Sequence, residues 1–116
     1  MSRRSARVLV DDMLARCDRI SRHLADTKRE TFLADEKTLD AVVRCLEIIG
    51  EAANRVPEDV MARHASVPWR RIVGLRHRIV HDYFEVDAAL VFEIAHREIP
   101  ILQEALRALR KDLPPD

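Results

Sequence analysis

The chain has 116 residues, and its 20 basic and 20 acidic side chains cancel to a formal net charge of zero. The length suits one domain around a single core of modest size, so we expect residues 1–116 to form one unit with a frayed tail at 113–116. The balanced charge excludes an overall field that would attract nucleic acid or an anionic membrane, and any such binding must therefore be local.

The cysteines and the apolar runs indicate a soluble, cytoplasmic protein. Cys17 and Cys45 form no CxxC pair and fall on apolar helical stripes, which is typical of reduced thiols in a core. No apolar run approaches the roughly 20 residues of a membrane span. The basic start of the chain leads into Asp11 and Asp12 instead of the apolar core of a signal peptide.

Few glycines and long stretches with a 3.6-residue period predict an all-α fold, an up-and-down bundle of about four to five helices. The first helix should run from about Ala6 to Lys28 on an apolar stripe. Asp35 is a suitable N-cap for a second helix that ends before Pro57, and a short helix over 58–64 is expected to follow.

The apolar face of the second helix is wider than one contact requires. It covers more than half of the circumference and consists of Leu39, Ala41, Val42, Val43, Cys45, Leu46, Ile48, Ile49, Ala52, Ala53 and Val56. Such a helix needs two neighbours, and we expect part of it to pack against a second subunit. Burial within one chain is the alternative.

Two further helices are expected in the second half of the chain. The fourth should start at Pro68, which suits the first helical position, and end near residues 82–84. The fifth should start after Asp87 as its N-cap and be kinked at Pro100, because proline removes a backbone donor and clashes with the preceding turn.

Arg76 is the least expected residue of the fourth helix. At about 100° per residue, it falls in the middle of an apolar sector. That sector consists of Trp69, Ile72, Ile79, Val80 and Tyr83. A buried guanidinium needs a partner, so Arg76 is either an internal strut or a functional cation. The candidate ion-pair partners are Glu98, which interrupts the apolar stripe of the fifth helix, and Glu51, at the edge of the second.

His81 is the candidate proton carrier, because the unperturbed pKa of histidine is about 6.5. Side chains that could bind a phosphodiester, basic groups and one hydroxyl, lie within one or two turns of His81. Two further arginines could extend this basic strip along the chain. The whole set is Arg70, Arg71, Arg76, His77, Arg78 and Tyr83. A polar helix face that is only solvated is the alternative.

A metal site is the weaker chemical interpretation. His77 and His81 have the i, i+4 spacing of two ligands on one helix, but Arg78 stands where the HExxH motif has its glutamate, and adjacent cations repel a divalent ion. We therefore expect neither a bound metal nor a cofactor.

Arg76, His81 and Tyr83 reproduce the R-x4-H-x-Y signature of HepT-like ribonuclease toxins of the HEPN superfamily, and the segment GLRHRIVHDYFEVD resembles that family's core segment. LEIIGEAANRVPED and REIPILQEAL are similar to family segments in the expected order. His77 is one departure, since the family often has asparagine there.

The resemblance implies an all-helical homodimer whose two motifs face each other across a cleft and form a metal-independent endoribonuclease site. Arg76 and His81 would cleave RNA, either mRNA or tRNA, by attack of the 2′-hydroxyl. In a type VII-like toxin-antitoxin system, a minimal nucleotidyltransferase antitoxin would use ATP to adenylylate Tyr83, or would neutralise the toxin simply by masking its site. On one ideal helix, Arg76 and His81 would lie about 140° apart, so a helix distortion or a partner subunit must complete the site.

Two other functions are compatible with the sequence. The chain could be a non-catalytic helical module that binds a nucleotidyltransferase or RNA, although a scaffold has no need for Arg76, His81 and Tyr83 together. It could also be a metal hydrolase, which would contain bound zinc or manganese.

Overall fold

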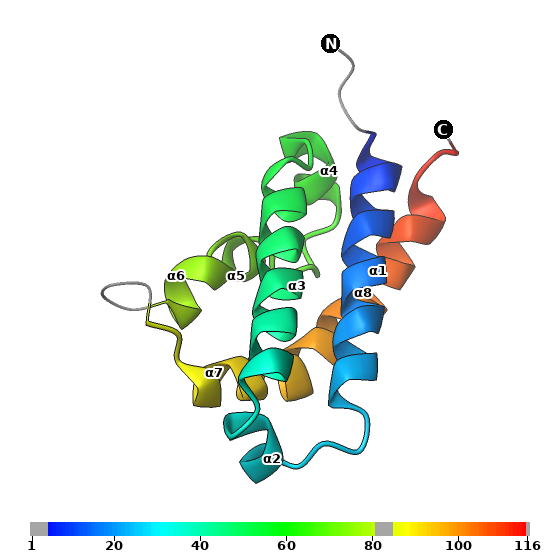
Figure 1. The fold of residues 1–116 in the computed structure, drawn as a ribbon. Helices are drawn as coiled ribbons and strands as arrows, with labels where there is room; N and C mark the ends of the chain where they lie inside the picture. Colours follow the sequence, from blue (N-terminus) through cyan, green and yellow to red (C-terminus); the bar gives the residue numbers. More distant parts are fainter. Residues whose placement is uncertain (1–4, 81–84, 116) are drawn as a thin grey trace.

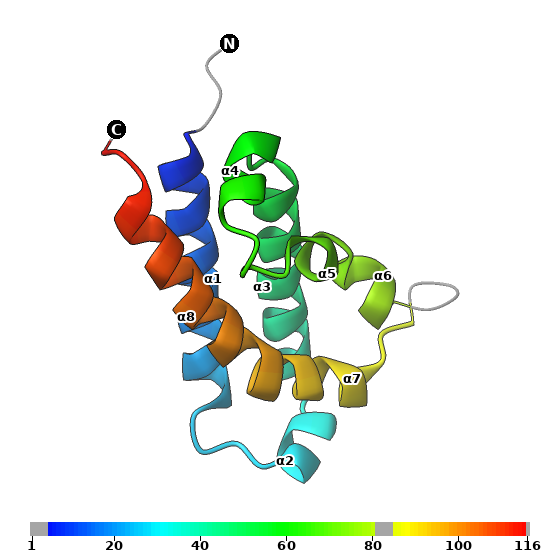
Figure 2. The ribbon, with the colours of Figure 1, turned by 180° about the vertical axis from the view of Figure 1, so that it is seen from behind.

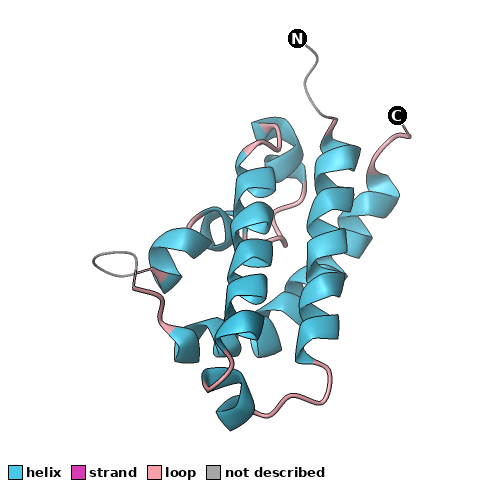
Figure 3. Ribbon diagram, viewed as in Figure 1, coloured by secondary structure: helices cyan, strands magenta, loops and turns pink. Residues whose placement is uncertain are grey.

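A computed structural model of the chain describes residues 5–80 and 85–115, and regular structure in these ranges is helical apart from one isolated bridge (Figures 1 and 3). The elements are α1 Ala6–Leu24, α2 Arg29–Leu33, α3 Glu36–Asn54, α4 Glu58–Arg63, α5 Trp69–Val73, α6 Leu75–Ile79, α7 Ala88–Glu93, the π-helical turn η2 Ile94–Glu98 and α8 Ile99–Asp112. The all-α prediction is confirmed, with more and shorter helices than expected. None of the described helices is both long and apolar enough to cross a membrane.

Helix α1 lies side by side with α3 and also packs against α8 (Figures 1 and 2). Ser5 caps its N-terminus by accepting a hydrogen bond from the backbone N–H of Val8 at 3.1 Å. The helix ends at Leu24, four residues before the predicted end at Lys28. Asp26 explains the early end, because its φ of 57° is left-handed and cannot continue a right-handed helix.

Helix α3 occupies the centre of the fold. Asp35 caps it as predicted, and its side chain accepts from the backbone N–H of Thr38 at 3.1 Å. The helix contacts α1, α2, α5, α6 and α7, and neighbours within the chain cover most of its wide apolar face. The residues buried on it are Val42, Cys45, Leu46, Ile49, Gly50, Ala52 and Ala53. A second subunit is therefore not needed to explain these positions, whereas Leu39, Val43 and Ile48 remain half-buried.

The core contains both cysteines as free thiols, which confirms the prediction of reduced cysteines. Burial raises the pKa of the Cys17 thiol to about 12, so this group is held in its unreactive, protonated form. Phe32 of α2 is fully buried and its ring lies 5.3 Å from that of Phe92 in α7, which attaches α2 to the base of the bundle.

The last helical stretch confirms two predictions. Asp87 caps α7 by accepting from the N–H of Leu90 at 3.1 Å. The distortion expected at Pro100 takes the form of the π-helical turn that ends at Glu98, where the helical axis changes direction (Figure 2). A wider turn relieves the crowding of the proline ring against the preceding backbone. This turn also determines where Glu98 lies.

Candidate functional site

The predicted fourth helix is two helices, and it ends earlier than expected. Gly74 separates α5 from α6, and α6 ends at Ile79 instead of near residues 82–84. Val80 is extended and forms an antiparallel bridge with Val86, while the N–H of Asp87 donates to the carbonyl of Ile79 at 2.8 Å. These contacts bring together the two ends of the segment that carries His81 and Tyr83. His81 and Tyr83 themselves lie outside the described residues.

The prediction that Arg76 lies in a buried sector is wrong. Leu75 and Ile79 are the core residues of α6, whereas Arg76 is exposed. The cause is the break at Gly74. The prediction extended the rotation of about 100° per residue of α5 to Arg76, but this rotation does not continue across an interruption of the helix. Among residues 5–80 and 85–115, no hydrogen bond or ion pair involves the Arg76 side chain. It is therefore not an internal strut within this part of the chain.

Glu98 forms an ion pair, but its partners are Arg78 and Arg71 instead of the predicted Arg76. The guanidinium of Arg78 donates from Nη1 to Oε1 at 2.9 Å and from Nη2 to Oε2 at 2.8 Å, and Arg71 Nη2 lies 3.3 Å from Oε1. Hydrogen bonds from Arg78 lower the pKa of Glu98, and the same bonds raise the pKa of Arg78. Both groups thus stay ionised, and the pair ties the end of α6 to the π-helical turn.

This ion pair separates the four predicted RNA-binding cations into two groups. Arg78 is about one quarter exposed and holds both carboxylate oxygens, and Arg71 shares one of them. Arg70 and His77 are exposed and have no such partner among the described residues. Arg70, Arg76 and His77 are consequently the nitrogen-bearing side chains of this region that are available to a ligand.

A surface groove lies between α3 and the α5–α6 pair, at the place where Figure 1 shows α5 and α6 beside the middle of α3. Its volume is about 420 Å³, within the ~300–1,000 Å³ range of small-molecule sites. It is lined by Leu46, Glu47, Gly50, Glu51, Asn54, Arg70, Val73, Gly74, Arg76 and His77. The groove brings Arg70, Arg76 and His77 together with Glu51, four residues selected from the sequence.

Gly50 allows the close approach of α5 to α3 that forms the floor of this groove. A Cβ atom at this position would lie 2.9 Å from the carbonyl oxygen of Ile72, which is closer than side chains tolerate against a backbone atom. Any larger residue would have to push α5 away from α3. The glycine therefore controls the separation of the two walls.

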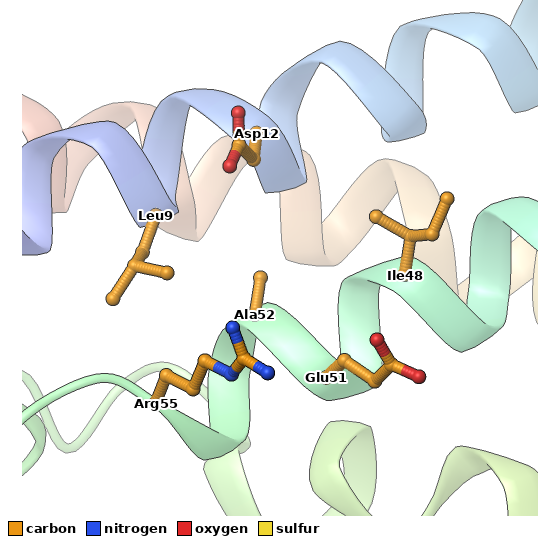
Figure 4. Close-up of a pocket in the computed structure, with 6 residues that line it drawn as sticks. All are labelled: Leu9, Asp12, Ile48, Glu51, Ala52 and Arg55. Carbon is orange, nitrogen blue, oxygen red and sulfur yellow. The ribbon is translucent and has the colours of Figure 1, made fainter. Parts of the chain in front are cut away.

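Glu51 stands on the ridge between this groove and a second pocket. The second pocket lies between α1 and α3 and is lined by Leu9, Asp12, Ile48, Glu51, Ala52 and Arg55 (Figure 4). Its volume of about 140 Å³ is small beside the roughly 300 Å³ at the lower end of ligand sites. The larger groove is thus the better candidate site. Glu51 makes no ion pair with Arg76 within the described part of the chain.

Sequence reasoning selected Glu51 but missed the rest of the α3 wall of the groove, including Glu47 and Asn54. Glu47, Glu51 and Asn54 follow one another at i, i+4 and i+7, the spacing of one helix face, and this polar stripe is the signal that could have found it. No group of three or more metal-ligating side chains occurs in residues 5–80 and 85–115. The His77–His81 pair considered above includes a residue outside these ranges.

Comparisons with known proteins agree on one family. The family described as Ribonuclease HepT-like matches residues 13–109. The "Probable ribonuclease HepT" of Thermococcus cleftensis is 35% identical over 109 residues, which are 94% of this chain and 99% of that protein. The "Putative RNase MJ0125" of Methanocaldococcus jannaschii is 34% identical over 113 residues, 97% of each chain. No solved structure gave a significant match.

Proposed function

Because the chain belongs to the HepT-like ribonuclease family, we propose that it is a metal-independent endoribonuclease, the toxin of a type VII-like toxin-antitoxin pair. The observation that carries the proposal is the groove beside α6. Arg76 is exposed there with no partner among the described residues, and it stands five positions before His81. A cation in this state is available to a phosphate group.

The reaction that fits these groups is transesterification. The ribose 2′-hydroxyl attacks the adjacent phosphorus and the bond to the 5′-oxygen breaks. Arg76 stabilises the additional negative charge of the transition state, where a preorganised cation acts most strongly. His81 moves a proton, a contribution typically worth about 10²- to 10⁴-fold. Arg70 and His77 bind neighbouring phosphates of the strand.

The family resemblance supplies the regulatory part of the proposal. A minimal nucleotidyltransferase antitoxin transfers AMP from its ATP to Tyr83, and the added bulk and negative charge repel RNA from the groove. We further propose that the chain acts as a homodimer in which the two motif segments face a shared cleft. The substrate is single-stranded mRNA or tRNA.

The function is tested by the rate at which the purified protein cuts single-stranded RNA. We expect cleavage by the wild type and a fall of about 10²-fold or more in His81→Ala, because a proton carrier is lost. His23→Ala, at an exposed histidine of α1 away from the groove, is the matched control and should keep the wild-type rate. RNA binding without any cleavage would support a non-catalytic module, and an unchanged rate in His81→Ala would remove His81 from the mechanism.

A further inference from the structure

Two carboxylates and three basic side chains line the groove without pairing. Arg70, Arg76 and His77 belong to its α5–α6 wall, and Glu47 and Glu51 belong to its α3 wall. None of these five side chains forms a hydrogen bond or ion pair in the part of the chain that the structure describes. They are therefore available to a ligand that contacts both walls.

The spacing of Glu47 and Glu51 is unfavourable for the helix that carries them. They lie four residues apart on the face of α3 that lines the groove, and like charges at this spacing destabilise a helix. No ion pair with the opposite wall relieves this repulsion within residues 5–80 and 85–115. An arrangement that lowers local stability without a compensating contact is typical of a functional site.

The groove also contains apolar surface. Val73 is 38% exposed there, and the buried side chain of Leu46 is part of the same lining. Such a surface suits the flat face of a ring, because contact with it removes apolar area from water. A fitting ligand thus has an anionic group for the basic wall, hydrogen-bond donors for the acidic wall and a flat ring.

A nucleotide has these three properties, and the carboxylates select its base. A carboxylate only accepts hydrogen bonds. The Watson–Crick edge of guanine carries two adjacent donors, N1–H and the 2-amino group, which match the two oxygens of one carboxylate. Adenine, cytosine and uracil each place an acceptor beside the donor on this edge, and a carboxylate repels that acceptor. Unpaired bases in single-stranded RNA expose this edge to proteins, so the acidic wall favours guanosine.

Glu47 is better placed than Glu51 to contact the base. Glu47 is half-buried, whereas Glu51 is exposed on the ridge beside the pocket between α1 and α3 (Figure 4). A hydrogen bond is electrostatically stronger at the less hydrated position, and it therefore discriminates more sharply between bases. On the opposite wall, Arg70 and Arg76 supply guanidinium groups that suit a phosphate.

We propose that the groove binds one unpaired guanosine nucleotide of an RNA strand, with the guanine edge on Glu47 and the phosphate on Arg70 and Arg76. The face of the guanine ring lies against Val73. The choice of an RNA strand as the ligand rests on the proposed ribonuclease function. Glu47 is then the residue that determines base specificity.

The first test is the affinity of the wild type for two RNA strands, an oligouridylate and the same strand with one central guanosine. The wild type should bind the strand with guanosine about 5- to 150-fold more tightly, the range for one good bidentate contact with a base. Inosine lacks the 2-amino group and should lose part of this preference in place of guanosine. Equal binding of the two strands would overturn the proposal, and so would an inosine strand bound as tightly as the guanosine strand.

Glu47→Gln tests whether this carboxylate contacts the base. The amide keeps the shape of the side chain but turns a donor toward one of the guanine donors, so the variant should bind the two strands almost equally. Its affinity for the oligouridylate should not fall, because a charge that repels phosphate is removed. Asp40→Asn is the matched control, since Asp40 is an exposed carboxylate of α3 outside the groove, and this variant should keep the preference for guanosine.

The stability of Glu47→Gln and the binding of a second variant complete the test. Glu47→Gln should unfold at no lower temperature than the wild type, because it removes one of two neighbouring like charges. A clearly lower temperature would contradict the repulsion from which the site is inferred. A preference that persists in Glu47→Gln and disappears in Glu51→Gln would overturn the assignment to Glu47.

These binding measurements separate the guanosine site from the ribonuclease function. A wild type that prefers the guanosine strand but cuts no RNA would support the site and overturn the ribonuclease function. A wild type that cuts RNA and binds the two strands equally would overturn the guanosine site alone.

Discussion

Arg76 and Arg78 stand two residues apart on α6, yet their side chains have different surroundings. Arg78 is held by both oxygens of Glu98, and Arg76 is exposed in the groove. The sequence identified Glu98 correctly as a charge that needs a partner, but it assigned the wrong arginine. The choice between the two depends on how α6 is placed against the π-helical turn, and residue spacing does not contain that information.

This difference predicts how each arginine affects RNA binding. The logarithm of the RNA affinity falls linearly as the logarithm of the salt concentration rises. Arg76→Ala should make this negative slope less steep by about 0.7, the value for one phosphate contact on a single strand. Arg78→Ala should leave this slope unchanged and lower the free energy of unfolding by roughly 1 kcal/mol, because its pair is partly exposed. Arg22→Ala, at an exposed pair on α1, is the control for both quantities. A slope made less steep by the same amount in Arg76→Ala and Arg78→Ala would show that Arg78 leaves Glu98 to bind RNA.

Among the elements, the starts of α3 and α7 and the end of α3 before Pro57 could be predicted, whereas the end of α1 and the division of the predicted fourth helix could not. Asp35 and Asp87 cap their helices as expected, because capping depends on a hydrogen bond to a backbone N–H three residues ahead. The break at Gly74 and the end of α6 at Ile79 were missed. Short helices of this kind, five residues each in α5 and α6, are stabilised by their packing and not by their own sequence.

The packing of α5 on α3 gives a prediction for Gly50. Gly50→Ala should lower the free energy of unfolding by about 1–3 kcal/mol, since its Cβ would meet the backbone oxygen of Ile72 at 2.9 Å. Thermal or denaturant unfolding measures this change. Gly74→Ala is the comparison, because its Cβ would lie 3.3 Å from the oxygen of Arg70 and needs only a small adjustment. A loss of stability in Gly50→Ala no larger than in Gly74→Ala would contradict the close contact of α5 with α3.

The molecule as a whole carries no net charge, yet Arg70, Arg76 and His77 lie along one groove. Part of α3 was expected to pack against a second subunit, but neighbours within the chain cover most of its apolar face. The fold class could be read from apolar periodicity and from the family segments. The α3 wall with Glu47 and Asn54 could not, because it joins residues that the chain brings together only when α5 and α6 fold back on α3. Proximity of this kind is a property of the tertiary structure.

We propose that this chain cuts RNA by transesterification with its own side chains. This proposal is tested most directly by incubating single-stranded RNA with the wild type in excess EDTA and identifying the new ends. We predict undiminished cleavage that leaves 2′,3′-cyclic phosphate and 5′-hydroxyl ends. Loss of cleavage in EDTA with recovery on added divalent metal, or products with 5′-phosphate ends, would contradict the account.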